Sequence, residues 1–222
     1  MPNVRLISTN EVSVMPDQPF IARGFHGRRA QSPKGRLPPG QYETDDFPVL
    51  SAGPTPHTPL TKWSFTVQAP GGQSMAWSWA ELQALPHETP TVDIHCVTKW
   101  SKFDTKWEGV SIDTLLDLAF PAGVSRGAYV LAYSDGGYTT NLTLDDVTGG
   151  RAWLAFGYGG APLEAEHGGP ARLLVPHRYF WKSAKWVRGL KLLTEDESGF
   201  WEQNGYHDRA DPWREQRYQG DP

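Results

Sequence analysis

Alternating hydrophobic and polar residues divide the chain into short predicted elements from about residue 63 onward. The segment WSFTVQ alternates as a half-buried strand does, and the APGG that follows is a turn signal. Beyond it, Trp79, Leu82 and Leu85 recur at helical spacing behind Ser78, which is suited to an N-cap. This pattern predicts a strand, a turn and a short helix that stops at Pro86.

A second strand is predicted in TVDIHCVTKW. Period-two alternation places Val92, Ile94 and Cys96 on one face of this strand and Asp93 and His95 on the other. The polar stretch TKWSKFD that follows is expected to lie outside the strand. Cys96 is therefore expected at the end of a strand, where its side chain shares a face with apolar neighbours.

The remaining pattern predicts one more helix and several more strands. Ser111 is expected to cap a helix that contains Leu115, Leu116 and Leu118 and ends at Pro121. Strand patterns recur in AYVLAYS, RAWLAFGY and RLLVP, separated by the glycine-rich turns DGGYTT, GGAP and HGGP. The sum predicts an α+β domain with mixed sheets and short helices.

Breaker residues divide the chain into three predicted regions. Residues 1–60 are rich in Pro, Gly and charge and predict an irregular N-terminal arm. Residues 61–193 carry the strand and helix patterns and form the predicted core. Residues 194–222 are polar, with irregularly spaced aromatic residues, and are expected to wrap the surface of the core as a C-terminal tail.

Composition and charge exclude several function classes. A net charge of −4 and a pI near 6.0 give no basic surface for a nucleic acid. No apolar run approaches the roughly 20 residues that span a bilayer. The N-terminus lacks a secretory pattern, and no hydrophobic stretch follows the Arg28-Arg29 pair as a twin-arginine signal requires. The expected partners are small molecules or proteins, and the expected location is the cytoplasm.

Cys96 is the single cysteine of the chain. Free cysteines are often buried and behave as inert small hydrophobes. However, Lys99 and Lys102 follow closely, and a positive environment lowers the pKa of a thiol. A nucleophilic cysteine needs a base, and His95 points to the opposite face of the strand, whereas a thiolate bound to a soft metal needs none. The inert thiol and the metal ligand both remain open interpretations.

A second cluster of polar residues lies in HGGPARLLVPHRYFWKSAKWVRGLKLL. Its glycines allow a bulky ligand to approach the backbone, and its many cationic donors suit an anion such as a phosphate. Taken singly, each cation is also compatible with a solvated surface position.

The segments DIHCVTKWSKFDTKWEGV and HGGPARLLVPHRYFWKSAKWVRGLKLL resemble the two signature stretches of the sulfite oxidase family of molybdopterin enzymes. The likeness is greatest to small bacterial members that consist of the molybdenum domain alone, and it extends from about Leu37 to the tail. Cys96 is followed by His167, by Arg172 five positions later and by Lys185 thirteen positions beyond that. The resemblance implies a sulfite oxidase-like fold and an oxidoreductase.

The resemblance also implies a cofactor and its contacts. In that family a cysteine thiolate binds molybdenum beside the two dithiolene sulfurs of a pterin, and the matching residue, Cys96, becomes both metal ligand and catalytic residue. The metal–pterin cofactor, without haem, performs oxygen-atom transfer on a small substrate, and an external partner exchanges the electrons. The positions that match the family's pterin and phosphate contacts are His167, Arg172, Ser183, Ala184, Lys185, Val49, Leu50, Ser51, Ser134 and Asp135. Tyr138 and Tyr179 are expected near the pocket.

One departure from the family bears on the substrate. Sulfite-oxidising members place Arg and His in the loop that is FPVLSAG here, where this chain has Val49 and Ser51. Lys99 supplies only one positive charge for a dianion. Sulfite is therefore not the expected substrate.

Two other function classes remain as alternatives. Cys96 with His167 or His177 as base would make a thiol hydrolase or transferase. The ten tryptophans of the chain would instead suit a non-enzymatic ligand-binding module. A catalytically silent relative that keeps the fold and the pterin is a third possibility.

Overall fold

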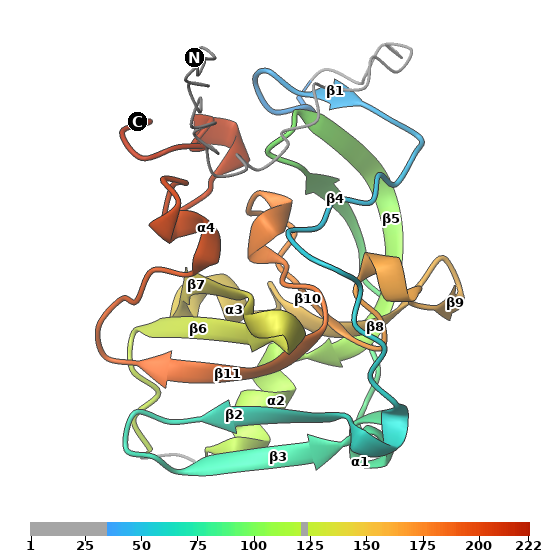
Figure 1. Ribbon diagram of the computed structural model, residues 1–222, viewed down its shortest axis with the longest axis vertical. Coiled ribbons are helices and arrows are strands. Elements are labelled where there is room, and N and C mark those ends of the chain that lie inside the picture. Colours follow the sequence, from blue (N-terminus) through green and yellow to red (C-terminus); the bar gives the residue numbers. More distant parts are fainter. Residues whose placement is uncertain (1–34, 121–123) are drawn as a thin grey trace, which may run out of the picture.

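The computed structural model describes residues 35–120 and 124–222, which form two β-sheets joined by short helices (Figure 1). The first sheet has six strands and runs in the order β1-β5-β8-β10, with β4 paired to β5 and β9 paired to β8. Its strands are β1 (Tyr42–Glu43), β4 (Thr91–His95), β5 (Trp100–Ser111), β8 (Trp153–Tyr158), β9 (Ala161–Pro162) and β10 (Arg172–Leu174).

The second sheet has five strands in the order β3-β2-β11-β6-β7 and lies across the lower part of Figure 1. Its strands are β2 (Ser64–Gln68), β3 (Ser74–Ser78), β6 (Tyr129–Ser134), β7 (Thr139–Thr143) and β11 (Val187–Leu193). β11 pairs parallel with β2 and antiparallel with β6. The helices are α1 (Trp79–Gln83), α2 (Ile112–Ala119), α3 (Leu144–Val147) and α4 (Phe200–Gln203). This architecture confirms the predicted α+β class with mixed sheets and short helices.

The helix starts show how local sequence fixes the elements. α1 begins after Ser78, whose hydroxyl accepts a hydrogen bond from the Glu81 backbone while the Glu81 carboxylate accepts one from the Ser78 backbone. Ser111 also stands at the N-cap of α2, but its side chain makes no capping hydrogen bond. Pro121, the predicted end of α2, lies outside the described residues.

Two buried hydrophobic clusters organise the interior. The larger one joins residues of both sheets to α2, including Phe65, Leu115 and Leu190. The smaller one surrounds Cys96 and includes Ile94. A register irregularity between Val92 and Ile94 interrupts the strict alternation of β4. Ile94 and Cys96 nevertheless share one cluster, as the alternation predicts.

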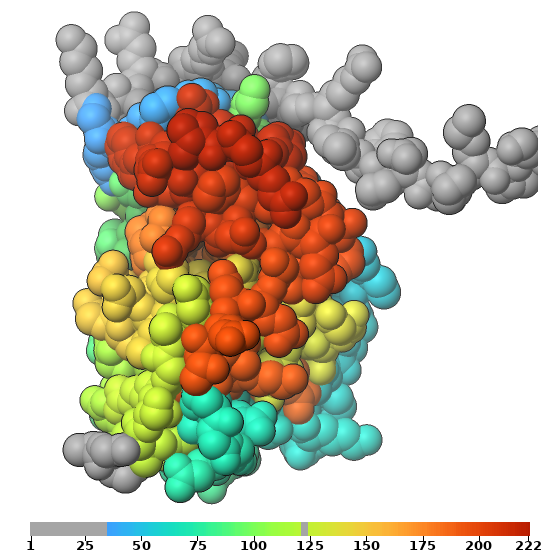
Figure 2. Space-filling view, turned by 90° about the vertical axis from the view of Figure 1, so that its left-hand side faces the viewer, coloured from blue at the N-terminus to red at the C-terminus, as the bar shows by residue number. Residues whose placement is uncertain are grey.

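The C-terminal segment packs on the second sheet through α4, and Figure 2 shows it in red over the upper part of one face. Its Glu202 is fully buried and accepts a hydrogen bond of 2.5 Å from the equally buried Lys182 Nζ. Trp181 Nε1 and Thr140 Oγ1 donate to the same Glu202 oxygen at 2.9 and 3.1 Å. Within the described residues, no helix has the length and apolar character that crossing a bilayer requires.

Replacing Glu202 by leucine should lower the free energy of unfolding by about 3–5 kcal/mol, because it leaves the Lys182 ammonium buried and unpaired. Urea denaturation measures this change. The double variant Lys182→Met/Glu202→Leu removes both charges and should recover much of the loss. A single variant as stable as the wild type would contradict a buried ion pair.

Candidate active site

Cys96 directly follows β4, at a tight reversal into β5. The Cys96 backbone N–H donates to the Trp100 carbonyl at 2.8 Å, and the Lys99 N–H donates to the Cys96 carbonyl at 3.0 Å. Lys99 takes a left-handed conformation with φ of 77° to close this turn. Gln41, which directly precedes β1, donates a hydrogen bond from Nε2 to the Cys96 carbonyl at 3.1 Å. The turn therefore holds the cysteine firmly at the strand end.

The Cys96 sulfur is buried, with 7% of the residue exposed. Thr98 Oγ1 donates a hydrogen bond to Sγ at 3.2 Å. Burial raises the pKa of the thiol, and the Thr98 hydroxyl and the Lys185 ammonium oppose this only in part. The prediction that Lys99 and Lys102 lower the thiol pKa is wrong, since Lys102 Nζ turns to the Asp45 carbonyl at 2.5 Å and burial dominates. A metal would have to displace the thiol proton.

Arg172 lies on β10 and is 1% exposed. Its Nη1 donates to the His167 carbonyl and its Nη2 to the Ser183 carbonyl, both at 2.7 Å. Its guanidinium also stands over the Phe180 ring, 4.0 Å from the centroid. Burial lowers the pKa of Arg172 to about 9, while the charges of Tyr138 and Cys96 act in the opposite direction. Arg172 thus links the segment that contains His167 to the segment that contains Ser183 by hydrogen bonds.

Lys185 joins this cationic group from the connection between β10 and β11. Its Nζ donates to the Leu50 carbonyl at 2.8 Å and to the Glu166 carbonyl at 2.6 Å. Burial and, after it, the Arg172 charge lower its pKa to about 8, with Cys96 and Glu166 opposing the shift. The structure therefore brings Arg172, Lys185 and the thiol into one electrostatically coupled group.

The FPVLSAG loop, residues 47–53, reaches this group through Leu50. Val49 and Leu50 are 45% and 42% exposed, so they form an apolar rim beside Lys185. Ser51 Oγ donates to the Gly53 carbonyl at 2.7 Å and so shapes the loop. Of the three predicted loop residues, Leu50 thus contacts Lys185 through its carbonyl, and Val49 and Ser51 are its neighbours in the sequence.

His167 ends the short 3-10 helix Ala165–His167, and its ring stacks on Phe47 with centroids 3.9 Å apart. Burial and the nearby Lys185 and Arg172 lower the pKa of this imidazole. Its Nδ1 is buried and has no hydrogen-bond partner among the described residues. Phe47 was not predicted as a site residue, although it opens the FPVLSAG loop.

Of four further predicted residues, Ser183, Ala184 and Asp135 have polar atoms bonded within the protein, and Ser134 has a free hydroxyl oxygen among the described residues. Ser183 Oγ accepts from the Val175 backbone at 2.9 Å, and the Ala184 carbonyl accepts from the Leu173 backbone at 2.9 Å. Ser134 is buried at the end of β6 with an unpartnered Oγ, counting the described residues only. The Asp135 carboxylate accepts from Thr58 Oγ1 at 2.7 Å and pairs with Arg188.

Tyrosines approach the thiol from positions that the sequence pattern does not reveal. Burial and then Cys96 raise the pKa of Tyr42, and burial, Tyr218 and then Cys96 raise the pKa of Tyr206, so both phenols are within electrostatic reach of the sulfur. By contrast, the expected Tyr138 donates to the Trp181 carbonyl at 2.6 Å, and Tyr179 is fully buried under Arg217. Tyr206 lies in the tail, where irregular aromatic spacing gave no signal.

The residues present fit the expected pterin and metal. Buried polar groups normally find partners, yet Arg172 Nε, His167 Nδ1 and Trp100 Nε1 have none among the described residues. A ligand rich in acceptors would satisfy them. Among residues 35–120 and 124–222, no group of three or more His, Cys, Asp or Glu side chains could hold a metal. A metal at Cys96 therefore needs further ligands from outside the chain, as dithiolene sulfurs would supply.

The thiol hydrolase alternative finds no base in this geometry. The side-chain hydrogen bond to the Cys96 sulfur comes from Thr98, whereas His177 Nε2 bonds Asp146 at 3.2 Å. His167 stacks on Phe47. Burial lowers the pKa of His95 to about 4, and its Nδ1 bonds Ser101 Oγ at 2.8 Å.

Residues 52–201 match the family described as the oxidoreductase molybdopterin binding domain. The chain is 44% identical to the uncharacterized oxidoreductase YuiH of Bacillus subtilis over 200 residues, which cover 89% of this chain and 100% of that protein. It is 30% identical to the putative protein-methionine-sulfoxide reductase subunit YedZ1 of Azospira oryzae over 147 residues, 65% of this chain and 55% of that protein.

More distant similarities are found in one sequence and one crystal structure. Sulfite oxidase of Gallus gallus is 26% identical over 184 residues, which cover 69% of this chain and 39% of that protein. The chain thus spans only part of the YedZ1 and sulfite oxidase relatives. The crystal structure of the sulfane dehydrogenase SoxCD from Paracoccus pantotrophus superposes with a TM-score of 0.56 at 21% identity, covering 64% of this chain and 41% of that one. This likeness concerns the fold.

Proposed function

Because the chain belongs to the oxidoreductase molybdopterin-binding domain family, which is sulfite oxidase-like, we propose that Cys96 binds the molybdenum of a haem-free pterin cofactor. The family membership confirms the resemblance seen in the sequence and makes the chain an oxidoreductase. The proposed reaction is oxygen-atom transfer with a small neutral substrate.

The grouping of the Cys96 thiol with Arg172 and Lys185 is the observation that supports this proposal. The thiol, Arg172 and Lys185 come from three separate parts of the fold, and each alters the pKa of at least one of the others. Buried donors without protein partners line the same region. A buried thiol beside two cations and unsatisfied donors suits a cofactor that brings both a soft metal and an anionic phosphate.

Different residues of the chain would have different roles in binding the cofactor. The bound metal would supply the two-electron oxygen-transfer chemistry, with an external electron partner closing the cycle. Arg172 and Lys185 would hold the phosphate, the first as a planar fork and the second as a point charge. Thr98 would donate to the thiolate and so moderate its electron density. Ser183 and Ala184 would present backbone groups beside the phosphate, with Ser134 and Asp135 flanking the pterin.

The rim of the site favours a neutral substrate. Val49 and Leu50 expose apolar surface, and the phenols of Tyr42 and Tyr206 lie within electrostatic reach of the sulfur. Phenol hydroxyls can donate to a neutral S–O oxygen, whereas a sulfite dianion would need more cations than this rim presents. We therefore propose a neutral sulfoxide, in line with the putative methionine-sulfoxide reductase name of the Azospira relative. The cytoplasm is the proposed location, because a lone thiol suits a reducing compartment.

Elemental analysis combined with fluorescence of the oxidised, released pterin tests the proposal. Protein made in a host that synthesises the cofactor should contain molybdenum and pterin in equal amounts, near one per chain. Protein from such a host with neither component would overturn the proposed function.

Pterin retention should fall as the pH rises through about 8, the value to which burial lowers the pKa of Lys185. Below this pH the ammonium is charged and attracts the phosphate, and above it the empty site loses that charge. Affinity should then decrease by up to about tenfold per pH unit. Dialysis at pH 7 and pH 9, followed by pterin fluorescence, measures the effect. Lys185→Arg keeps its charge and should show a much flatter profile; an equally steep one would assign the pH dependence to another group.

A further inference from the structure

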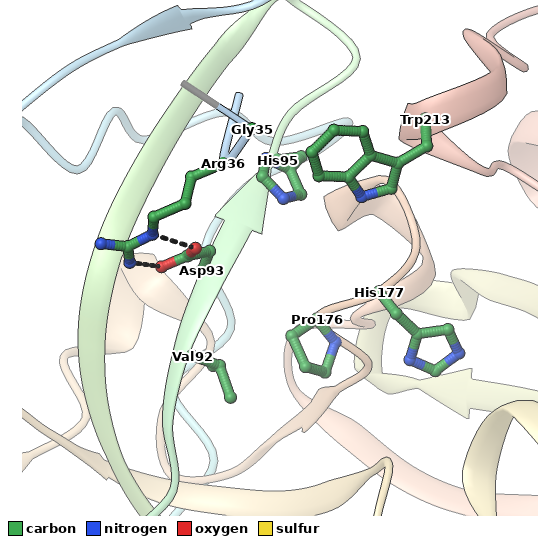
Figure 3. A pocket seen from close by; sticks show the side chains of 8 residues that line it. All are labelled: Gly35, Arg36, Val92, Asp93, His95, Pro176, His177 and Trp213. Atoms are coloured by element: carbon green, nitrogen blue, oxygen red, sulfur yellow. Dashed lines mark hydrogen bonds and ion pairs between the residues drawn. The ribbon is translucent and has the colours of Figure 1, made fainter. Parts of the chain in front are cut away.

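A shallow, open cavity lies beside the strand that leads to Cys96, and neither Arg172 nor Lys185 lines it (Figure 3). It has a volume of about 350 Å³ and opens between β4, the segment after β10 and the C-terminal segment. It is lined by Gly35, Arg36, Val92, Asp93, His95, Pro176, His177 and Trp213. Its size suits a small molecule or a single side chain.

The hydrogen bonds around His95 fix what this residue offers to the cavity. Gln41 Nε2 donates to the Cys96 carbonyl at 3.1 Å, so Gln41 Oε1 is the acceptor for Ser101 Oγ at 3.4 Å. Ser101 Oγ then accepts from His95 Nδ1–H at 2.8 Å. His95 Nε2 is left as a bare acceptor without a partner in the described part of the chain, on a residue that is only 5% exposed.

The opposite wall offers a second acceptor. His177 Nε2 bonds the Asp146 carboxylate at 3.2 Å, and since a carboxylate only accepts, Nε2 carries the hydrogen. In the neutral ring Nδ1 is therefore an acceptor too. Trp213 completes the wall with a ring that is 49% exposed.

The cavity wall carries one guanidinium group, Arg36, and one carboxylate, Asp93, and the ion pairs at and behind the wall include more carboxylates than guanidinium groups. Arg36 is shared by Asp93 and Asp104, at 2.6 and 2.8 Å. On the other side, Asp146 and Asp211 share Arg178, at 2.8 and 3.5 Å. Each guanidinium is thus outnumbered by carboxylates, so the surroundings disfavour an anion.

We propose that this cavity is a binding site for a planar organic cation of the guanidinium class, which donates to the two imidazoles and stacks on Trp213. Acceptors, an aromatic face and an excess of carboxylates together match the N–H donors, the flat shape and the charge of such a group. Through Ser101 and Gln41 the occupant would be linked by hydrogen bonds to the Cys96 carbonyl. The proposal does not depend on the metal or the pterin.

Titration with methylguanidinium, followed by NMR of the Trp213 indole N–H and the His95 ring nitrogens, tests the site. Methylurea is the matched neutral probe, since it keeps the planar shape and N–H donors. Methylguanidinium should shift both sets of signals, and methylurea should bind at least about tenfold more weakly. Equal binding of the two probes would overturn the assignment to a cation.

Substitutions of the lining residues test whether methylguanidinium binds in this cavity or elsewhere on the surface. Trp213→Ala, at an exposed position, should weaken methylguanidinium binding by about fivefold or more. His95→Phe should weaken it similarly, with circular dichroism to confirm folding. Leu118→Ala, on the exposed side of α2, is the control and should bind as the wild type does. Unchanged binding in Trp213→Ala would contradict the proposed stacking.

Discussion

Replacing Cys96 by serine is expected to abolish oxygen-atom transfer while the pterin stays bound. The sulfur is the only side-chain donor that the proposed metal takes from the chain, and a hydroxyl is a much poorer ligand for a soft metal. The phosphate contacts of Arg172 and Lys185 do not involve this sulfur and should survive. Turnover of a sulfoxide and fluorescence of the released pterin measure the two effects on one sample.

Thr98→Val is the matched comparison for this experiment. It removes the hydrogen bond to Sγ but keeps the ligand and the shape of the side chain. Activity should fall by about 10-fold to 100-fold rather than vanish, as is typical when a hydrogen bond to a metal ligand is lost. Wild-type turnover in Cys96→Ser would exclude an essential thiolate ligand.

Replacing Arg172 by methionine is expected to empty the cofactor site. Arg172 holds the His167 and Ser183 carbonyls and adds a buried charge beside the proposed phosphate. The variant removes the charge and the unpartnered Nε donor that the phosphate would use. One charge-assisted hydrogen bond is worth about 1.5–3 kcal/mol, so pterin affinity should fall by at least about tenfold. Pterin content after purification measures the loss.

Arg126→Met is the control for this variant. Arg126 pairs with Asp117 at 2.7 Å and donates to the Phe120 carbonyl just after α2, and none of these residues is proposed to hold the pterin. Its loss should leave most of the pterin in place. If both arginine variants retain the pterin equally, the proposed role of Arg172 in holding the phosphate is wrong.

Much of the fold follows from local sequence. The strand patterns of WSFTVQ and AYVLAYS predicted β2 and β6, and Ser78 as N-cap predicted the start of α1. β5 and β11 escaped prediction because charged residues interrupt their patterns. WSKFDTKWEGVS carries lysines on the open face of its strand, and VRGLKLL was read as part of a phosphate-binding segment although it is the central strand of the second sheet.

The site residues that could be predicted are those whose order along the chain matches the family pattern. Cys96, Arg172 and Lys185 were predicted in their order along the chain, and the structure brings them into one coupled group. The contributions of Tyr42 and Tyr206 could not be predicted, since they depend on the pairing of β1 with β5 and on the bridge between Tyr206 and Tyr218 within the tail. The environment of the thiol was also mispredicted, because sequence neighbours such as Lys102 point elsewhere while Lys185 arrives from a distant segment.

X-ray absorption at the molybdenum edge tests the central claim most directly. The holoenzyme should show three sulfur neighbours around molybdenum, two from the pterin and one from Cys96, and Cys96→Ser should show two. The same number of sulfur neighbours in both proteins would contradict Cys96 as a ligand of the metal.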